Sequence, residues 1–474
     1  MRSLAVLLTL AFGALAPVAS AQQDDWGFDD EETWESSPAD EPDVAPEDES
    51  FLRLFDLTGD VSLGSSYNYL HHHSATGTGY GNLSRLRAQL DLQLDVDLPA
   101  GWQTRVSGYG FYDFAYVARG RSRYTDDVLD DYEWEVEFRE VWIQGSPLSS
   151  LDVKLGRQVV NWGRSDTLRV LDVLNPLDNR EPGLVDIEDL RLPVTMARVD
   201  WYPSWIPREY GQWSLQLLVI PEFRQDRNPS IGNDFNPTPF EIDPPSDKPD
   251  QFFDSPEYGV QIKGTFSGWD VSVYGARIYA NQPLVVSALG GVLQRHPLVT
   301  MVGAGGNYTL ESWLFKGEIA WFDQLEYTSF EPVDVRVVDK SRLDAMGGVE
   351  YYGINDFQVA LEVVHRHIFR YDPAMKAEFM GVEIAYAEED VTEAALRLTW
   401  NLMNERLSLT GVGFVLVGNA EDHLGSVLRF EADYELMDAL SLGGGIVLYQ
   451  EGDSPALGDV GKNDRLFLRI EYAF

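Results

Sequence analysis

The residues best suited to chemistry lie in one charged stretch of the chain. It holds cationic, anionic, amide and indole side chains in close succession: Arg157, Asn161, Trp162, Arg164, Asp166, Arg169, Asp172, Asp178 and Arg180. Opposite charges at this density can hold a segment in place as ion pairs, or they can line a narrow passage and filter solutes by size and field. The two interpretations carry equal weight at this point.

Other groups of reactive residues are less specific. Residues 71–73 are three consecutive histidines, and His365 and His367 share one face of an extended segment. Neither group has Cys, Asp or Glu nearby at the spacing of a structural zinc site. The acidic stretch 451–464 lacks the ordered ligand pattern of an EF-hand, and the chain has no Gly-x-Ser-x-Gly motif. We therefore predict no metal site, no cofactor and no enzymatic activity, with a histidine-dependent hydrolase as the competing class.

The composition excludes several classes of protein. Among 474 residues there are 36 Lys plus Arg and 77 Asp plus Glu, a formal net charge of −41. Nucleic-acid binding needs clustered cations, so we predict no nucleic-acid partner. The absence of cysteine rules out disulfides and thiolate metal sites. With 44% hydrophobic and 12% aromatic residues, the chain as a whole is not disordered.

The first residues predict export. Arg2 precedes an apolar run over 4–15, and Ala19-Ser20-Ala21 has the small residues of a cleavage site. We interpret residues 1–21 as a signal peptide that directs the chain through the Sec route. No later stretch approaches the roughly 18 to 20 apolar residues of a membrane-spanning helix, so we do not expect the chain to stay in the inner membrane.

Residues 22–50 are predicted to be a disordered acidic leader. They contain 13 Asp or Glu and no Lys or Arg, so the segment repels itself and cannot fold alone. Trp26, Phe28 and Trp34 also make it a docking peptide candidate for a periplasmic or inner-membrane transport partner. The alternative is a solvated tail.

From residue 51 onward, apolar and polar side chains alternate. Between 86 and 98 the even positions are Leu, Ala or Val and the odd positions are Arg, Gln or Asp. Successive side chains of a strand point to opposite faces, so this stretch has one apolar and one charged face. Residues 99–101 then turn the chain into a second strand at 102–117, which completes an antiparallel hairpin.

The pattern recurs along the chain. We predict strands at 57–70, 83–98, 102–117, 132–145, 151–160, 194–202, 212–223, 257–267, 269–280, 298–309, 312–322, 344–354, 357–370, 392–403, 406–418, 424–437, 439–450 and 465–474. Short turns alternate with long links at 71–82, 118–131, 161–193, 224–256, 281–297, 323–343, 371–391 and 451–464.

This alternation is typical of outer-membrane barrels, which have short periplasmic turns and long external loops. We predict an all-β fold, a transmembrane antiparallel β-barrel of about 18 strands, with 14 to 18 as the range, over residues 51–474 in the outer membrane of a Gram-negative bacterium. Lipid and lipopolysaccharide are then its surroundings. Aromatic residues near the predicted strand ends fit interface girdles: Tyr67, Tyr69, Tyr109, Phe111, Tyr112, Phe114, Tyr116, Tyr351 and Tyr352.

In this barrel most of the charged stretch lies in the third external link, and Arg157 lies at the end of the preceding strand. We expect Arg157 to pair with a carboxylate of the link. Strand parity points a set of acids into the lumen: Asp91, Asp95, Glu133, Glu135 and Glu137. An acidic lumen favours cations over anions.

The last strand ends on an aromatic residue. Apolar and polar residues alternate over 465–474, and Tyr472 and Phe474 share the apolar face. This terminus resembles the C-terminal signal of outer-membrane proteins. The resemblance implies the barrel-assembly machinery as a partner.

A further resemblance rests on four short motifs. These are Gly156-Arg157-Gln158, Trp162-Gly163, Asn175-Pro176 and Leu192-Pro193-Val194. Together they resemble an uncharacterised proteobacterial outer-membrane family, similar to alginate-export-type and other substrate-selective barrels. The resemblance implies uptake or export of hydrophobic compounds beside inner-membrane pumps, whereas the alternating strands show no fully hydrophobic conduit.

The predicted function is therefore an outer-membrane channel or transporter for a small solute or hydrophobic compound, with the third external link as its constriction. A barrel hydrolase and a structural or adhesive barrel are the alternatives.

Overall fold

The computed structural model describes residues 54–70, 73–185, 187–236, 246–247, 255–288, 291–331, 334–379, 382–419, 422–454, 457–458 and 460–474. The predicted signal peptide at 1–21 and the predicted leader at 22–50 lie outside these described residues. So do His71 and His72.

Eighteen strands of the described residues form one antiparallel sheet. They are β1 (Phe55–Asn68), β2 (Asn82–Leu98), β3 (Trp102–Asp113), β4 (Trp134–Leu148), β5 (Leu151–Gln158), β6 (Val194–Trp201), β7 (Gln212–Ile220), β9 (Glu257–Phe266), β10 (Trp269–Tyr279), β13 (Leu298–Leu310), β14 (Trp313–Glu331), β15 (Asp334–Ile354), β16 (Phe357–Ile368), β19 (Asp390–Leu402), β20 (Leu407–Val417), β21 (His423–Met437), β22 (Leu440–Gln450) and β23 (Arg465–Ala473).

The sheet closes on itself. Each strand pairs with its neighbours in the chain, and β1 pairs with β2 on one side and with β23 on the other. The prediction of a closed antiparallel barrel of about 18 strands is confirmed.

Side-chain alternation gives the barrel an apolar outside. On β4, Trp134, Val136 and Phe138 are 58%, 76% and 64% exposed, whereas the intervening Glu135 and Glu137 bind arginines of the interior. Such exposure of large apolar side chains suits lipid rather than water. The backbone polar groups meanwhile pair along the closed ladder, as a membrane-spanning sheet requires.

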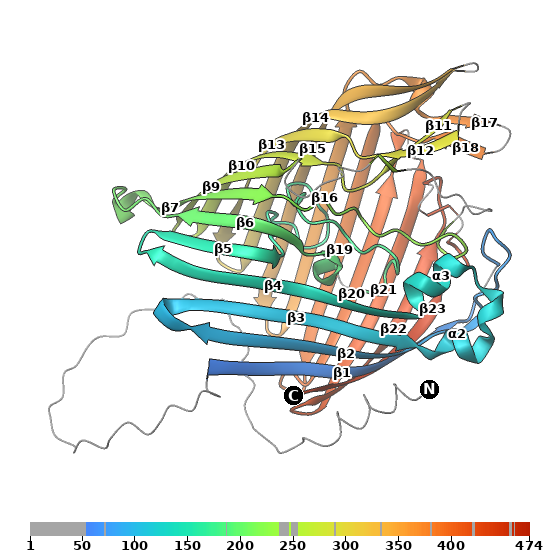
Figure 1. Cartoon of the computed structure of the whole chain (residues 1–474), viewed down its shortest axis with the longest axis horizontal. Helices are drawn as coiled ribbons and strands as arrows, with labels where there is room; N and C mark the ends of the chain where they lie inside the picture. Colours follow the sequence, from blue (N-terminus) through green and yellow to red (C-terminus); the bar gives the residue numbers. More distant parts are fainter. Residues whose placement is uncertain are drawn as a thin grey trace. The chain divides into compact units, whose positions relative to one another are not determined.

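The long links lie together on one side of the barrel, which Figure 1 shows on the right with α2, α3 and two small sheets. The shorter elements are α2 (Phe114–Arg119), α3 (Asp126–Tyr132), β8 (Ser246–Asp247), β11 (Leu284–Ala288), β12 (Gly291–Arg295), β17 (Ala377–Phe379), β18 (Val382–Ala385), and the 3-10 turns η2 (Pro99–Gly101), η3 (Arg121–Arg123), η4 (Ile187–Leu190), η5 (Arg208–Tyr210) and η6 (Pro373–Met375). No helix among the described residues has the length and apolarity to cross a membrane.

The two strands predicted on either side of the second long link, 118–131, have other boundaries than predicted. The strand predicted at 102–117 stops at Asp113, because its carboxylate accepts hydrogen bonds from the backbone N–H of Ala115 (3.0 Å) and Leu86 (2.9 Å) and caps α2. The strand predicted to start at 132 starts at Trp134, and Glu133 ends α3 instead. The expected place of Glu133 on the inward strand face is therefore wrong.

The link predicted at 323–343 is also wrong, because β14 and β15 continue as a paired hairpin to Glu331 and Asp334. Apart from a bulge after Phe322, the ladder is continuous. Charged residues are frequent along this extension, and they obscure the apolar alternation that marked the rest of each strand.

The expected aromatic girdle is only partly correct. Tyr67 and Tyr352 are exposed, as a girdle position requires. Phe111 is instead 8% exposed with Arg87 stacked on its ring, Tyr109 contacts Glu137, and Tyr116 packs in a small core with residues of α3. These three face the interior because they lie on the opposite parity of β3 or beyond its end.

One glycine of the barrel wall should be essential for folding. Gly156 on β5 has φ +126°, and a Cβ there would lie 2.2 Å from the carbonyl oxygen of Val141. We expect Gly156→Ala to lower the free energy of unfolding by about 3 kcal/mol or more and to reduce the yield of assembled barrel. The measurement is the fraction of heat-modifiable protein on a gel. Gly64→Ala on β1, where a Cβ meets nothing within 4 Å, is the matched control and should assemble normally; equal yields would contradict the prediction.

Candidate functional site

One buried amide side chain, that of Asn175, forms hydrogen bonds with both ends of the third long link, residues 159–193. The Oδ1 of Asn175 accepts from the N–H of Val160 (2.9 Å), and its Nδ2 donates to the carbonyl oxygens of Gln158 (3.3 Å) and Leu192 (2.9 Å). Gln158 and Asn175 are fully buried. One side chain thus ties together both ends of the link, and three of the four sequence motifs meet here.

Trp162, near the start of the third link, is buried in the interior of the barrel. Its indole N–H donates to Gln216 (2.8 Å), its ring packs on Tyr274 at 5.3 Å between centroids, and only 1% of it is exposed. Gly259 makes room, since a Cβ there would lie 2.7 Å from the indole. Trp162 belongs to a large apolar cluster with other link residues, namely Leu168, Val170, Leu171 and Leu174, and with inward side chains of the wall.

Two wall carboxylates hold the link's backbone, and we call them the loop anchor. Glu362 of β16 accepts from the N–H groups of Asp166 (2.8 Å), Thr167 (3.0 Å) and Leu168 (3.2 Å) and from the hydroxyl of Ser165 (2.6 Å).

The second carboxylate is Glu318 of β14, which accepts from the N–H groups of Arg164, Ser165 (3.2 Å) and Leu171 (3.2 Å). Both anchor residues are nearly fully buried, whereas the residues beside them, Ile319 and Leu361, are exposed on the outside. The link therefore lies inside the barrel.

Ion pairs complete this attachment. Arg164 binds Asp270 (2.5 Å) and Ser272 (2.9 Å) of β10. Lys316 of β14 binds Asp166 (2.6 Å) and also Glu350 on β15. Arg164 and Asp166 of the link thus each meet an opposite charge on an inward strand face.

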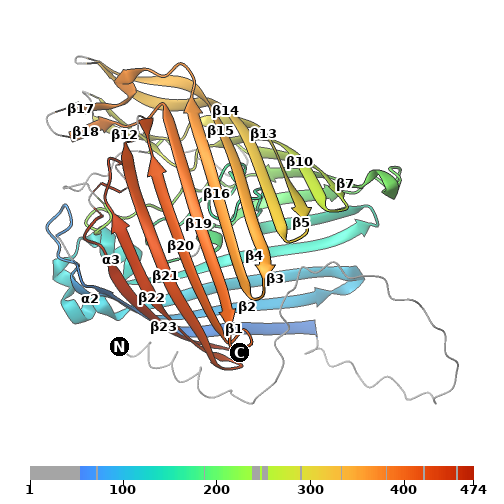
Figure 2. The same ribbon diagram turned by 180° about the vertical axis from the view of Figure 1, so that it is seen from behind.

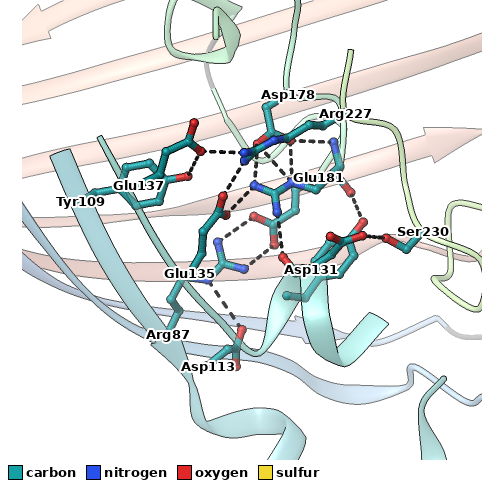
Figure 3. Close-up of polar contacts among 12 residues, drawn as sticks. Arg87, Tyr109, Asp113, Asp131, Glu135, Glu137, Asp178, Glu181, Arg227 and Ser230 are labelled. Atoms are coloured by element: carbon teal, nitrogen blue, oxygen red, sulfur yellow. Dashed lines mark hydrogen bonds and ion pairs between the residues drawn. The ribbon is translucent and has the colours of Figure 1, made fainter. Parts of the chain in front are cut away.

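On another side of the interior, two arginines from different links meet the acids of β4. We call Arg180, Arg227, Asp178, Glu135 and Glu137 the arginine cluster, of which Figure 3 labels Arg227 and the three acids. Arg180 binds Asp178 (2.6 Å) and Glu135 (2.8 Å). Arg227, from the fourth long link, binds Glu135 (2.5 Å) and Glu137 (2.7 Å). The cluster joins both links to the wall.

Glu137 gathers further cations. Arg157 of β5 binds it at 2.9 Å, and Arg224 of the fourth link binds it as well. The expectation that Arg157 pairs with a carboxylate of its own link is therefore wrong. The register of β4 and β5 pairs Arg157 with Val141, so its side chain reaches along β4 to bind Glu137.

Glu181 attaches the third link to β2, a strand of the first hairpin. Its carboxylate binds Arg85 (3.3 Å) and Arg87 (3.0 Å) of β2, and the next residue, Pro182, accepts from the hydroxyl of Tyr449 on β22 (2.6 Å). Burial favours the neutral acid, but the two guanidinium groups outweigh it and lower the pKa of Glu181 to about 2. The link therefore reaches from the β14–β16 wall to β2 and β22.

The remaining predicted residues of the stretch bind within the link. Asp172 pairs with Arg169 (3.2 Å) and Arg191 (2.8 Å), and only 3% of its side chain is exposed. Arg169 also donates to the carbonyl oxygen of Asn175 (2.8 Å). Asn161 accepts from the N–H of Gly163 (2.9 Å) and makes a turn. These residues shape the link itself.

The predicted lumen acids are paired with arginines. Asp95 of β2 binds Arg105 on the neighbouring β3 (2.8 Å), and Asp91 of β2 binds Arg139 of β4, one strand further (3.4 Å). Glu133, at the end of α3, binds Arg121 (2.9 Å). The acids that strand parity predicted for the lumen are therefore not free charges but members of ion pairs.

A cavity of roughly 600 Å³ lies beside the arginine cluster, on the side of the long links. It is lined by Asp127, Asp130, Asp131, Glu135, Arg180, Gln225, Asp226, Arg227, Asn228, Ser230, Ile231, Pro283 and Gln294. We call it the vestibule. Five of its seven charged lining residues are acids, three of these acids lie on α3, and its two cations are those of the arginine cluster.

Several residues of this site were missed by sequence reasoning. Glu318 and Glu362 alternate with apolar neighbours, so strand parity alone could have placed them inside. Arg224 and Arg227 had no such signal, because a long link has no periodicity to say where its side chains point. Tyr472 and Phe474 lie on the exposed face of the closing strand, where the backbone of Phe474 pairs with Gly59 of β1 in both directions (2.8 and 3.0 Å).

The closed barrel with an apolar outer face and a charged interior defines a transmembrane β-barrel of the porin type. The chain belongs to the family described as "Protein of unknown function (DUF1302)", which it matches over residues 3–473. No curated protein matches it.

Among solved structures, the chain is similar to a BenF-like porin from Pseudomonas fluorescens Pf-5, with 12% identity, a TM-score of 0.50 and coverage of 88% of this chain and 98% of that chain. It is also similar to OccAB2 from Acinetobacter baumannii, with 9% identity, a TM-score of 0.49 and coverage of 90% and 99%. At these identities the likeness concerns the fold.

Removal of the loop anchor should free the third link. In Glu362→Ala, three backbone N–H groups and one hydroxyl lose their shared acceptor, so we expect the link to leave the wall and trypsin to cleave after Arg164 or Arg169 at least about tenfold faster, since each buried hydrogen bond to a charge contributes on the order of 2 kcal/mol. The control is Glu435→Ala, an exposed acid on the short-turn side. Equal cleavage rates in both variants would show that the anchor does not hold the link.

The ion pair of Glu181 should make stability depend on pH. A pKa lowered from 4.5 to about 2 corresponds to roughly 3 kcal/mol, present above pH 4.5 and lost as the pH falls toward 2. At pH 7 we expect Glu181→Gln to unfold at a lower temperature than the wild type, and the difference should shrink as the pH falls from about 5 toward 2. Heat-modifiability gels at several pH values measure it. Glu209→Gln, in exposed η5, should show no difference, and a pH-independent gap for Glu181→Gln would contradict the assignment.

Proposed function

We propose that this protein is an outer-membrane channel for small polar solutes, in which the third and fourth long links narrow the lumen at the arginine cluster. The observation that carries the proposal is that Arg180 and Arg227, from two different links, bind the inward acids of one wall strand. Charges held across a lumen in this way filter solutes by size and field.

The vestibule supplies the entrance in this proposal. Its acids on α3, Asp127, Asp130 and Asp131, lie on the side of the long links, and the arginine cluster lies at its inner boundary. A solute would pass an acidic region first and a region of four arginines and three acids next, counting Arg157 and Arg224 with the cluster. This order favours solutes that carry charge or strong dipoles.

The interior offers less to apolar cargo. Trp162, Leu168 and Leu171 of the third link cover inward apolar side chains of β10, β13 and β14. What remains along the arginine cluster is charged, and burying apolar surface against paired ions gains little. Uptake of hydrophobic compounds is therefore the weaker candidate.

The cellular setting is part of the proposal. The exposed apolar belt suits the outer membrane of a Gram-negative bacterium, with lipopolysaccharide around the long links. The aromatic C-terminus supports recognition by the barrel-assembly machinery, the first 21 residues support export through the Sec route, and residues 22–50 are the proposed contact with a periplasmic or inner-membrane transport partner.

A histidine-dependent hydrolase is the weaker candidate, and the surroundings of His296 give it no support. The Nδ1 of His296 lies 2.8 Å from the carbonyl oxygen of Ala280, and its ring packs edge-on against Phe223 at 4.8 Å. This is the arrangement of a packed, hydrogen-bonded side chain.

Loss of the arginine cluster's cations should change ion selectivity. In Arg180→Ala combined with Arg227→Ala, Glu135 and Asp178 lose both arginines and Glu137 loses one of three, so we expect the permeability ratio of cations to anions to rise about twofold or more and single-channel conductance to increase. Reversal potentials of refolded protein in planar bilayers under a salt gradient measure this ratio.

The control for charge alone is Arg208→Ala, in the turn between β6 and β7 on the opposite side of the barrel. It should leave selectivity unchanged. Identical reversal potentials for wild type and the double variant would remove the constriction, and a barrel that inserts correctly but never conducts would remove the channel.

A further inference from the structure

A second constellation of ligating side chains lies on the outside of the barrel. His365 and His367 are two residues apart on β16, on the face that also carries exposed Leu361 and Val363. The sequence shows no acidic companions close to them, but β19 supplies one, because register sets Asp390 directly beside His367. The expectation that these histidines lack such companions is therefore wrong.

Donor atoms of both histidines and of Glu389 lie close to the carboxylate of Asp390. The Nδ1 of His367 lies 2.7 Å from Oδ1 of Asp390, and the Nε2 of His365 lies 3.3 Å from the same oxygen. Ligand atoms of His367, Asp390 and Glu389 all lie within 4.8 Å of one another. Tetrahedral zinc, with bonds of about 2.0–2.1 Å, needs ligand atoms roughly 3.3 Å apart, a contraction that side-chain rotation can supply.

A neighbouring hydroxyl orients one of the rings. The Nδ1 of His365 lies 3.1 Å from the hydroxyl of Thr392. When Nδ1 carries the proton and donates it to Thr392, Nε2 keeps its lone pair toward Asp390 and is free to coordinate. Hydrogen bonds from the second ring nitrogen fix metal-binding histidines in this way.

We propose that His365, His367, Asp390 and Glu389 form a binding site for a zinc-type divalent ion at the rim of the barrel. Two imidazoles with two carboxylates are a donor set that zinc accepts, whereas calcium and magnesium prefer oxygen alone. All four side chains come from two chain segments that pair in the barrel ladder; His367, Asp390 and Glu389 already lie together, and His365 approaches Asp390.

The place of the site gives it a role. His367 is the second-last residue of β16, and Glu389 and Asp390 lead into β19, so the ion joins the two ends of the seventh long link, 369–389. The ends are already joined by hydrogen bonds from the N–H of Ile368 to the carbonyl oxygen of Glu389 (2.8 Å) and from the hydroxyl of Tyr371 to that of Ala387 (2.7 Å), and the ion would add a further connection. Metal bonds across the base of a loop restrict its opening.

Zinc binding by the full-length refolded barrel in detergent tests the site. Competition with a chromophoric zinc chelator should give one ion per chain in a background of His71→Ala, His72→Ala and His73→Ala, which removes the other histidine group. In that background, His367→Ala and Asp390→Asn should each weaken binding roughly tenfold or more. Exposed His365→Ala is a further variant that should fold, and His423→Ala is the matched control that should bind as the background does.

Tryptic cleavage after Arg370 and Lys376 supplies the second readout. Zinc should slow this cleavage in the background protein and leave it unchanged in Asp390→Asn, with correct assembly checked by heat modifiability. Lack of zinc binding, equal affinity in the His367, Asp390 and control variants, or cleavage that ignores zinc would each overturn the proposal.

Discussion

The interior of this barrel depends on wall carboxylates that accept hydrogen bonds from the backbone of a link. Glu362 and Glu318 together bind six N–H groups and one hydroxyl of residues 164–171. Irregular backbone inside a barrel has no ladder to pair with, and buried N–H groups without acceptors cost free energy. Two inward acids remove this cost, so the link can stay in the lumen and bring Arg180 to the arginine cluster.

In the interior of the barrel, charge is organised as ion pairs. The chain is strongly acidic, yet its inward acids meet arginines at hydrogen-bond distance: Asp95 with Arg105, Glu137 with Arg157 and Arg227. Paired and partly buried charges are screened less by salt than exposed ones. The lumen's local field is therefore set by which acid lies beside which arginine, and the overall charge of the chain says little about it.

Most of the fold could be predicted from strand parity and turn spacing, because every strand of a closed barrel has one face toward lipid and one toward the interior, which leaves the period-two pattern visible on nearly every strand. Parity also pointed Glu135 and Glu137 inward. It failed where Asp113 caps α2 and where β14 and β15 extend among charged residues. The site was harder to predict, since Arg227, Glu318 and Glu362 are more than 45 residues from the link residues that they bind, and only closure of the sheet brings them together.

The link's attachment also bears on how such a barrel can diversify. Asn175 ties together both ends of residues 159–193, and the segment between packs against inward wall side chains, whereas the wall itself is held by backbone pairs of the strand ladder. The side chains that would filter solutes in the proposed channel lie on the link and on inward strand faces, whereas lipid would meet only the outward faces. Changes in the membrane-facing surface and changes in the interior therefore fall on separate sets of positions.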